Sequence, residues 1–273
     1  HHARAPGEVV LDVRDLRLPR SSPFGVDLEG VALQVRAGEV VGIAGVSGNG
    51  QRELLFALSG EDQRAQAASI KIANTPAGRL PPGRRRALGL HFVPEERLGR
   101  GAVPDMSLAH NLLLTRREGV GPMGWLRARV LRTQAADTIQ RYRVKAAGPE
   151  APARSLSGGN LQKFIMGREI DARPRLLIVS QPTWGVDVGA AAQIRAEILA
   201  LRDAGCAVLV VSEELDELLE LSDRLHVIAK GQLSPSVDRR AATVQQIGEW
   251  MSGLWHGDVQ QHLQATEAAH AAP

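Results

Sequence analysis

Two kinds of hydrophobic pattern recur along the chain. Near the N-terminus, 8–16 and 31–38 alternate apolar and polar residues, which is typical of half-buried antiparallel strands. By contrast, 176–180 and 206–211 are continuously apolar, as parallel strands covered on both faces are. The chain has four further strand-like runs, at 40–45, 69–73, 89–94 and 225–231. The pattern therefore predicts a parallel sheet and an antiparallel one.

Helical patterns follow several of these strands. They lie at 50–59, 160–171, 189–204 and 214–221. Strand–helix alternation at this spacing predicts an α/β fold, with a mainly parallel sheet core flanked by helices and an antiparallel β subdomain. The segment 104–148 lacks a strong strand signal and is predicted to be a helical insertion between two β-containing parts.

Composition adds limits rather than a function. The chain has 273 residues, of which 44% are hydrophobic and 23% charged, ordinary values for a globular protein. No signal peptide is visible and no run approaches the roughly 18 apolar residues of a membrane span, so any membrane connection is expected to run through a partner. The net charge of +3 hints at an anionic partner, but the arginines are dispersed and the run 84–86 is interpreted as a solvated turn. Cys206, the only cysteine, is predicted to be a buried structural thiol.

The first motif with chemical content is 40-VVGIAGVSGNGQREL-54, a strand, a glycine-rich turn and a helix. Such a turn aims backbone N–H groups and the positive helix end at an anion. The phosphate-loop pattern G-x-x-x-x-G-K-[ST] has lysine and a hydroxyl residue where this chain has glutamine and arginine. The candidate phosphate-binding residues are Gly45, Val46, Ser47, Gly48, Asn49, Gly50, Gln51 and Arg52. From the residues alone, a plain strand-to-helix turn is the alternative.

The second motif, 155-SLSGGNLQKF-164, is another glycine turn before a helix. Ser157 is placed as an N-cap and hydroxyl donor, and 165–170 continues as an apolar-faced helix rather than a linker. The third motif, 175-RLLIVSQPTWGVDVGA-190, is an apolar strand with Ser180 and Gln181 where phosphate-loop ATPases keep an aspartate and a glutamate. Asp187 is either an inter-subunit contact or a helix cap.

These motifs in this order resemble the ATP-binding subunit of ABC transporters. The resemblance covers residues 8–235, with a helical subdomain at about 104–172 and a partly disordered C-terminal extension at 236–273. LSGGNLQK is a diagnostic signature of that family. VGIAGVSGNGQREL, VPEER and QPTWGVDVGA are similar to the second, C-terminal cassette of tandem ATPases that serve simple-sugar and nucleoside importers, with the Gln-Pro-Thr variant favouring the nucleoside branch.

The resemblance implies roles for further residues. Glu95 falls where the family's loop glutamine contacts magnesium and the permease, and Glu213 where the switch histidine lies. Phe24 is the one aromatic residue available ahead of the loop for adenine stacking. His91, His110 and His226 match no family position and are interpreted as structural or surface residues. With lysine, hydroxyl, aspartate, glutamate, glutamine and histidine all replaced, the chain's own site is predicted not to hydrolyse ATP at a useful rate.

The resemblance also implies an asymmetric pair. The signature residues Ser157, Gly158, Gly159 and Asn160 would complete the Mg²⁺-dependent ATP site of a first cassette, expected on the same natural chain. Permease subunits would bind the pair at the cytoplasmic membrane face, and a solute-binding protein would act indirectly. No nucleic-acid partner is expected. An autonomous ATPase and a nucleic-acid-associated ABC-type ATPase remain the alternatives, the latter prompted by the sequence pI of about 9.5.

Overall fold

Two β-sheets form the centre of the molecule in the computed structural model, which describes residues 7–116 and 120–255. The larger sheet has the order β10-β9-β3-β8-β7-β6, with β11 also paired to β9. Its five main strands are parallel, and all but β6 and β9 are fully buried along their length. The bounds of this sheet are β3 Val40–Ala44, β6 Leu90–Val93, β7 Leu176–Ser180, β8 Ala207–Ser212, β9 Arg224–Ala229, β10 Gln232–Leu233 and β11 Val237–Asp238.

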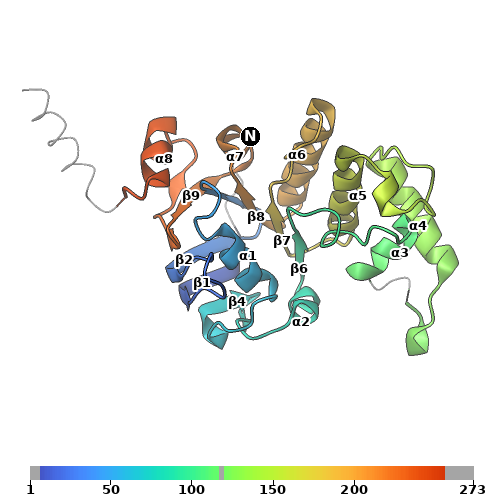
Figure 1. The fold of residues 1–273 in the computed structure, drawn as a ribbon, viewed down its shortest axis with the longest axis horizontal. Helices are drawn as coiled ribbons and strands as arrows, with labels where there is room; N and C mark the ends of the chain where they lie inside the picture. Colours follow the sequence, from blue (N-terminus) through green and yellow to red (C-terminus); the bar gives the residue numbers. More distant parts are fainter. Residues whose placement is uncertain (1–6, 117–119, 256–273) are drawn as a thin grey trace, which may run out of the picture.

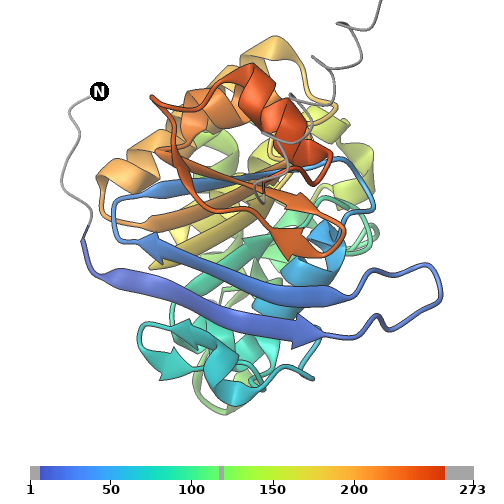
Figure 2. The ribbon, with the colours of Figure 1, turned by 90° about the vertical axis from the view of Figure 1, so that its left-hand side faces the viewer.

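The smaller sheet is antiparallel, with the order β2-β1-β4-β5. Its long strands bury alternate residues, as the sequence pattern predicted, so that one face packs into a second hydrophobic cluster with α1. Figure 2 shows the connection between β1 and β2 projecting beyond the body of the molecule. The bounds are β1 Val9–Leu18, β2 Leu28–Arg36, β4 Ile70–Ile72 and β5 Thr75–Pro76.

Helices cover the parallel sheet, and the insertion forms a separate helical layer. Figure 1 shows α3, α4 and α5 gathered beyond β6 and β7, on the side away from the antiparallel sheet. The helices are α1 Gln51–Ser59, α2 Pro82–Ala87, α3 Leu108–Asn111, α4 Ala128–Arg141, α5 Gly158–Asp171, α6 Val188–Asp203, α7 Leu215–Leu221 and α8 Val244–Met251. Short 3-10 turns are η1 Ala67–Ser69, η2 Leu112–Leu114, η3 Pro122–Gly124 and η4 Ala153–Ser155. The predicted helical insertion is confirmed.

A buried charge network joins this helical layer to the sheet. Glu169 of α5 is fully buried; its carboxylate lies 2.5 Å from His91 Nδ1 of β6 and accepts from Arg168 Nε at 2.8 Å. Arg168 in turn donates to the Asn111 carbonyl of α3. Burial alone would raise the pKa of Glu169, but the Arg168 charge and the His91 hydrogen bond outweigh it and lower that pKa. His91 is thus structural, as predicted.

One expectation needs correction. The run 84–86 is not a solvated turn: it belongs to α2, and Arg85 is completely buried. The Arg85 guanidinium donates to the carbonyls of Ala57, Leu58 and Gly78, so it closes the end of α1 against α2. The extension after 235 contains β11 and α8, whose Ile247 is buried in the main core; the predicted disorder at 256–273 lies outside the described residues.

We predict that Glu169→Ala strongly destabilises the fold. The variant leaves the Arg168 guanidinium buried without its carboxylate, which typically costs about 3–5 kcal/mol of the free energy of unfolding. The control is Glu150→Ala, which breaks the exposed ion pair with Arg132 and should cost less than about 1 kcal/mol. Urea unfolding of both variants is the measurement, and equal losses would contradict this role of the buried network.

Candidate functional site

The glycine loop lies between β3 and α1, as the sequence predicted. Helix α1 begins at Gln51, and its N-cap Gly50 has φ 107°, a conformation that favours glycine. Gly45 is constrained by space instead, because a Cβ there would lie 2.7 Å from Ile228. The strand, the turn and the helix start therefore point the first N–H groups of α1 at the loop.

The side chain of Gln51 closes this loop from within. Its Oε1 accepts the Asn49 N–H at 2.9 Å and its Nε2 donates to the Val46 carbonyl at 2.8 Å. The Asn49 side chain donates to the same carbonyl and accepts from the Lys230 N–H. The Asn49 N–H, one of the loop amides expected to bind an anion, is therefore already hydrogen-bonded to Gln51, which stands at the position of the phosphate-loop lysine. A phosphate would have to displace the Gln51 amide.

Arg52 is exposed to solvent, as predicted, and lies at the edge of the glycine-loop cavity. Its side chain is exposed, and its guanidinium carbon lies 5.1 Å from the centre of the Phe56 ring one turn along α1. Arg100 stacks on the same ring at 4.7 Å. A guanidinium has no acceptor atom, so the position of the magnesium-binding hydroxyl carries no ligand. Val46 and Ser47 are exposed at the tip of the loop.

The other replaced positions meet beside the loop. Gln181 follows β7, and its backbone N–H donates to the Val211 carbonyl of β8 at 2.8 Å. Its side-chain oxygen accepts from Ser212 Oγ and from the Glu213 N–H, both at 3.2 Å. Ser180 is buried at the strand end. A single cavity of about 460 Å³ is lined by the glycine loop together with Glu95, Ser180, Gln181 and Glu213, so positions far apart in the sequence converge as expected.

This cavity does not offer a magnesium ion the ligands it prefers. Burial raises the pKa of Glu95, and the neighbouring charges of Glu96 and Glu213 raise it further. Within 7–116 and 120–255, these carboxylates and the other acidic, histidine and cysteine side chains form no group of three that could hold a metal ion. With a serine and an arginine at the remaining positions, the residues present do not fit Mg²⁺. Phe24 lines the rim of the cavity and is 98% exposed.

The signature lies at the start of α5 and does not line this cavity. Ser157 caps the helix, as predicted: its Oγ accepts the Asn160 N–H at 3.4 Å and the Asn160 side-chain N–H at 2.9 Å. Asn160 also accepts the Lys145 N–H at 2.8 Å, which fixes its amide. Ser157 and Gly158 are exposed, and Gly159 is half-buried. Within residues 7–116 and 120–255 the Ser157 hydroxyl accepts and does not donate, so its own hydrogen is available to an external acceptor.

Two residues near these motifs, Glu217 and Arg97, were missed by sequence reasoning. Glu217 of α7 is buried and accepts from Thr183 Oγ1 at 2.5 Å and from Ser212 Oγ at 2.9 Å. Burial raises its pKa, although both hydrogen bonds oppose this shift. Arg97 is the other, and it contacts the signature helix. Asp187 caps α6 by accepting the Ala190 N–H, and these backbone hydrogen bonds lower its pKa, so the capping interpretation is confirmed.

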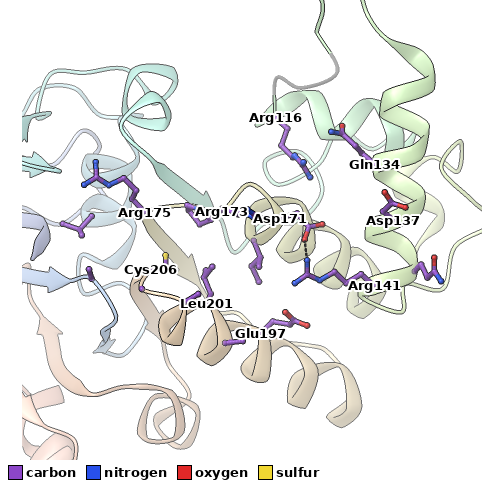
Figure 3. Close-up of a pocket in the computed structure, with 18 of the residues that line it drawn as sticks. Arg116, Gln134, Asp137, Arg141, Asp171, Arg173, Arg175, Glu197, Leu201 and Cys206 are labelled. Atoms are coloured by element: carbon purple, nitrogen blue, oxygen red, sulfur yellow. Dashed lines mark hydrogen bonds and ion pairs between the residues drawn. The ribbon is translucent and has the colours of Figure 1, made fainter. Parts of the chain in front are cut away.

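A second cavity lies elsewhere, between α4, the end of α5 and α6. Its volume is about 1090 Å³, and it shares no lining residue with the glycine-loop cavity. Figure 3 shows the side chains that line it, among them Gln134, Asp137 and Arg141 of α4. Arg141 and Asp171 form an ion pair across part of it at 3.0 Å. Cys206 lies at its base with 5% of its surface exposed, and burial raises the pKa of its thiol to about 12. The thiol is therefore structural, as predicted.

Comparison with known proteins places the chain in a family. The sequence profile described as "ABC transporter" matches residues 28–184, more than half of the chain. The chain therefore belongs to the ABC transporter family, and the expected cassette fold is confirmed by solved structures. One, described as the structure of the ATP binding subunit of an ABC transporter, has a TM-score of 0.72 at 17% identity, over 89% of this chain and 99% of that one.

Curated relatives narrow the type of cassette. The chain is 41% identical to the nucleoside import ATP-binding protein NupA of Lactococcus lactis, over 92% of this chain and 50% of that protein. It is 38% identical to the xylose import ATP-binding protein XylG of Burkholderia ambifaria (88% and 47%) and 34% identical to the ribose import ATP-binding protein RbsA of Halalkalibacterium halodurans (92% and 49%). The chain spans about half the length of these relatives. Each of these relatives is described as an import ATP-binding protein, for a nucleoside, xylose or ribose.

The closed loop predicts a measurable change in amide exchange. Gln51→Ala removes the acceptor of the Asn49 N–H, and one such hydrogen bond contributes about 1 kcal/mol, or roughly a fivefold change in opening. We expect Asn49 to exchange faster by about that factor, measured by NMR hydrogen exchange. The exposed Gln63→Ala serves as the control. Unchanged protection at Asn49 would show that Gln51 does not hold the loop.

The buried Glu217 predicts a pH-dependent contribution to stability. Its folded-state pKa is raised above 4.5, so above pH 4.5 the native carboxyl holds more protons than the unfolded one. Its contribution to the free energy of unfolding should therefore fall as the pH rises from 4.5 and become constant above the folded-state pKa. Urea unfolding of the wild type and of Glu217→Gln from pH 4 to 8 tests this, because the variant lacks the titration. If the free energy of unfolding of the wild type, relative to that of Glu217→Gln, increased with pH, the prediction would be wrong.

Proposed function

We propose that this chain is one half of an asymmetric cassette pair that energises the import of nucleosides or sugars. Its own glycine loop would be a degenerate, non-hydrolytic site, and its signature would complete the ATP site of the partner cassette. The observation that carries the proposal is the contrast between the two motifs. The Gln51 side chain already occupies the loop, whereas the hydroxyl of Ser157 is exposed and free to donate.

The chemistry of the loop supports a site that does not hydrolyse ATP. Gln51 carries no charge to balance the β and γ phosphates, and Gln181 has no basic oxygen to take a proton from water. Glu95 and Glu213 add negative charge where the γ-phosphate would lie, which repels it. Losing one stabilising donor typically costs about 3–4 kcal/mol in the transition state, so several losses together leave little activity. Any nucleotide held there would rely on backbone amides.

The signature supports a role in the partner's site. The helix start at Gly158 and the Ser157 hydroxyl together form a donor group that suits a γ-phosphate. ATP and Mg²⁺ would be held by the glycine loop and carboxylates of a first cassette, on the same natural chain. Relatives of about twice this length agree with such a tandem arrangement. One solved cassette of this fold is described as dimeric in two structures, one of them with ADP and Pi.

The remaining partners follow from the type of cassette. The described part of the chain has no helix long and apolar enough to cross a bilayer. As part of the same proposal, transmembrane permease subunits would bind the pair at the cytoplasmic face of the membrane, where the chain would be peripheral. A solute-binding protein would deliver the solute to those subunits. Similarity to both a nucleoside and two sugar import proteins supports this solute class.

A bulky substitution at Ser157 tests the proposal. The chain is paired with its natural first cassette, and Mg²⁺-dependent ATP hydrolysis is measured for Ser157→Trp. The indole removes the donor and fills the space of the γ-phosphate, so we expect turnover to fall by about 100-fold or more. Ser252→Trp, at an exposed position after α8, is the matched control. Undiminished turnover in Ser157→Trp would refute the proposed pairing.

A further inference from the structure

Arg97 connects three segments that meet behind the signature. It lies in the loop after β6, two residues beyond Glu95, and its Nε donates to Gln162 Oε1 of α5 at 3.1 Å. Its Nη2 donates to the carbonyl of Trp184, in the turn that follows β7. Gln162, which is 1% exposed, donates in turn to the Pro182 carbonyl at 3.0 Å. We call these hydrogen bonds of Arg97 and Gln162 the bracket. One guanidinium and one amide thus tie the helix to that turn.

The glycines of the signature leave room for this guanidinium. A Cβ built at Gly158 would lie 2.9 Å from Arg97 Nη1, closer than real Cβ contacts. Gly185, with φ 64°, brings the turn after β7 to the other side of the same nitrogen, with its ideal Cβ position at 3.9 Å. Arg97 is therefore packed directly beneath the first turn of α5. A side chain at Gly158 would therefore displace the Arg97 guanidinium.

Helix α5 is held to the parallel sheet at both ends. Near its C-terminus, Glu169 meets His91 of β6 in the buried network. Near its N-terminus, the bracket of Arg97 and Gln162 is the corresponding attachment. Ser157 immediately precedes this first turn, so its position in space depends on the second attachment. Neither attachment involves the glycine loop.

We propose that Arg97 is a positioning residue that holds the signature in one orientation against the sheet, whether or not nucleotide occupies the chain's own glycine loop. The inference deepens the proposed function, on which its functional meaning rests. A cassette that donates its signature to a partner needs that signature pre-oriented. Charge-assisted hydrogen bonds to two segments supply that orientation, because a planar guanidinium fixes both acceptors at once.

The test measures a distance in the chain alone. Spin labels are placed at Ala136 in α4 and Asp216 in α7, both exposed, in a Cys206→Ala background. Double electron–electron resonance should give a single distance population for the reference protein, unchanged by ATP with Mg²⁺. Arg97→Met should broaden it or add a second population. Arg97→Lys should restore it in part, since an ammonium can reach one acceptor but not hold both in plane.

Two further variants keep the result decisive. Arg132→Met removes another arginine of the helical layer, paired with Glu150 at the surface, and should leave the distances unchanged. Gln162→Leu removes the hydrogen bonds of Gln162 to Arg97 and to the Pro182 carbonyl, and should broaden the distance distribution as Arg97→Met does. It also provides the test if Arg97→Met does not fold. Distances in Gln162→Leu that superimpose on the reference would overturn the inference. Because no hydrolysis is measured, this outcome is independent of the Ser157 experiment.

Discussion

The buried carboxylate of Glu169 is the interaction on which the arrangement of the molecule depends. A helix that packs against the end of a parallel sheet can slide along it if only apolar side chains meet, because dispersion contacts have little direction. Glu169 removes that freedom, since it meets His91 from β6 on one oxygen and Arg168 on the other. Arg168 then reaches the carbonyl of Asn111, so α3 is aligned by the same charge. The positions of the signature helix α5 and of α3 in the insertion therefore both depend on the buried Glu169 carboxylate.

The glycine loop has the backbone of a phosphate-binding loop but different side chains. The strand, the turn and the helix that make a phosphate cradle are all present, and the left-handed Gly50 is retained. These backbone features follow from packing, because Gly45 is confined by Ile228 whatever the loop binds. The side chains are under no such constraint. An uncharged amide at Gln51 satisfies the loop from within at 2.8–2.9 Å, so the cradle is stable without a ligand.

The sequence predicted the elements with strong periodicity and the sites defined by motifs. Continuous apolar runs identified the parallel strands, and the glycine turns located both candidate sites, because local pattern and backbone chemistry determine these features. It failed where a tertiary contact reverses a local preference. An arginine in a polar run is expected in solvent, yet Arg85 is buried because three carbonyls converge on it. Arg97 and Glu217 were missed for the same reason: their partners are distant in sequence, at Gln162 and Thr183.

The amide of Gln51 has a consequence for the stoichiometry of the proposed pair. Two equivalent cassettes that close on each other trap two nucleotides and must release the products of both before they separate. A loop that stays filled by the Gln51 side chain would contribute no nucleotide to that count. One closure would then correspond to one ATP, and the rate of opening would be governed by product release at a single site. Transport would advance in steps of one hydrolysis rather than two.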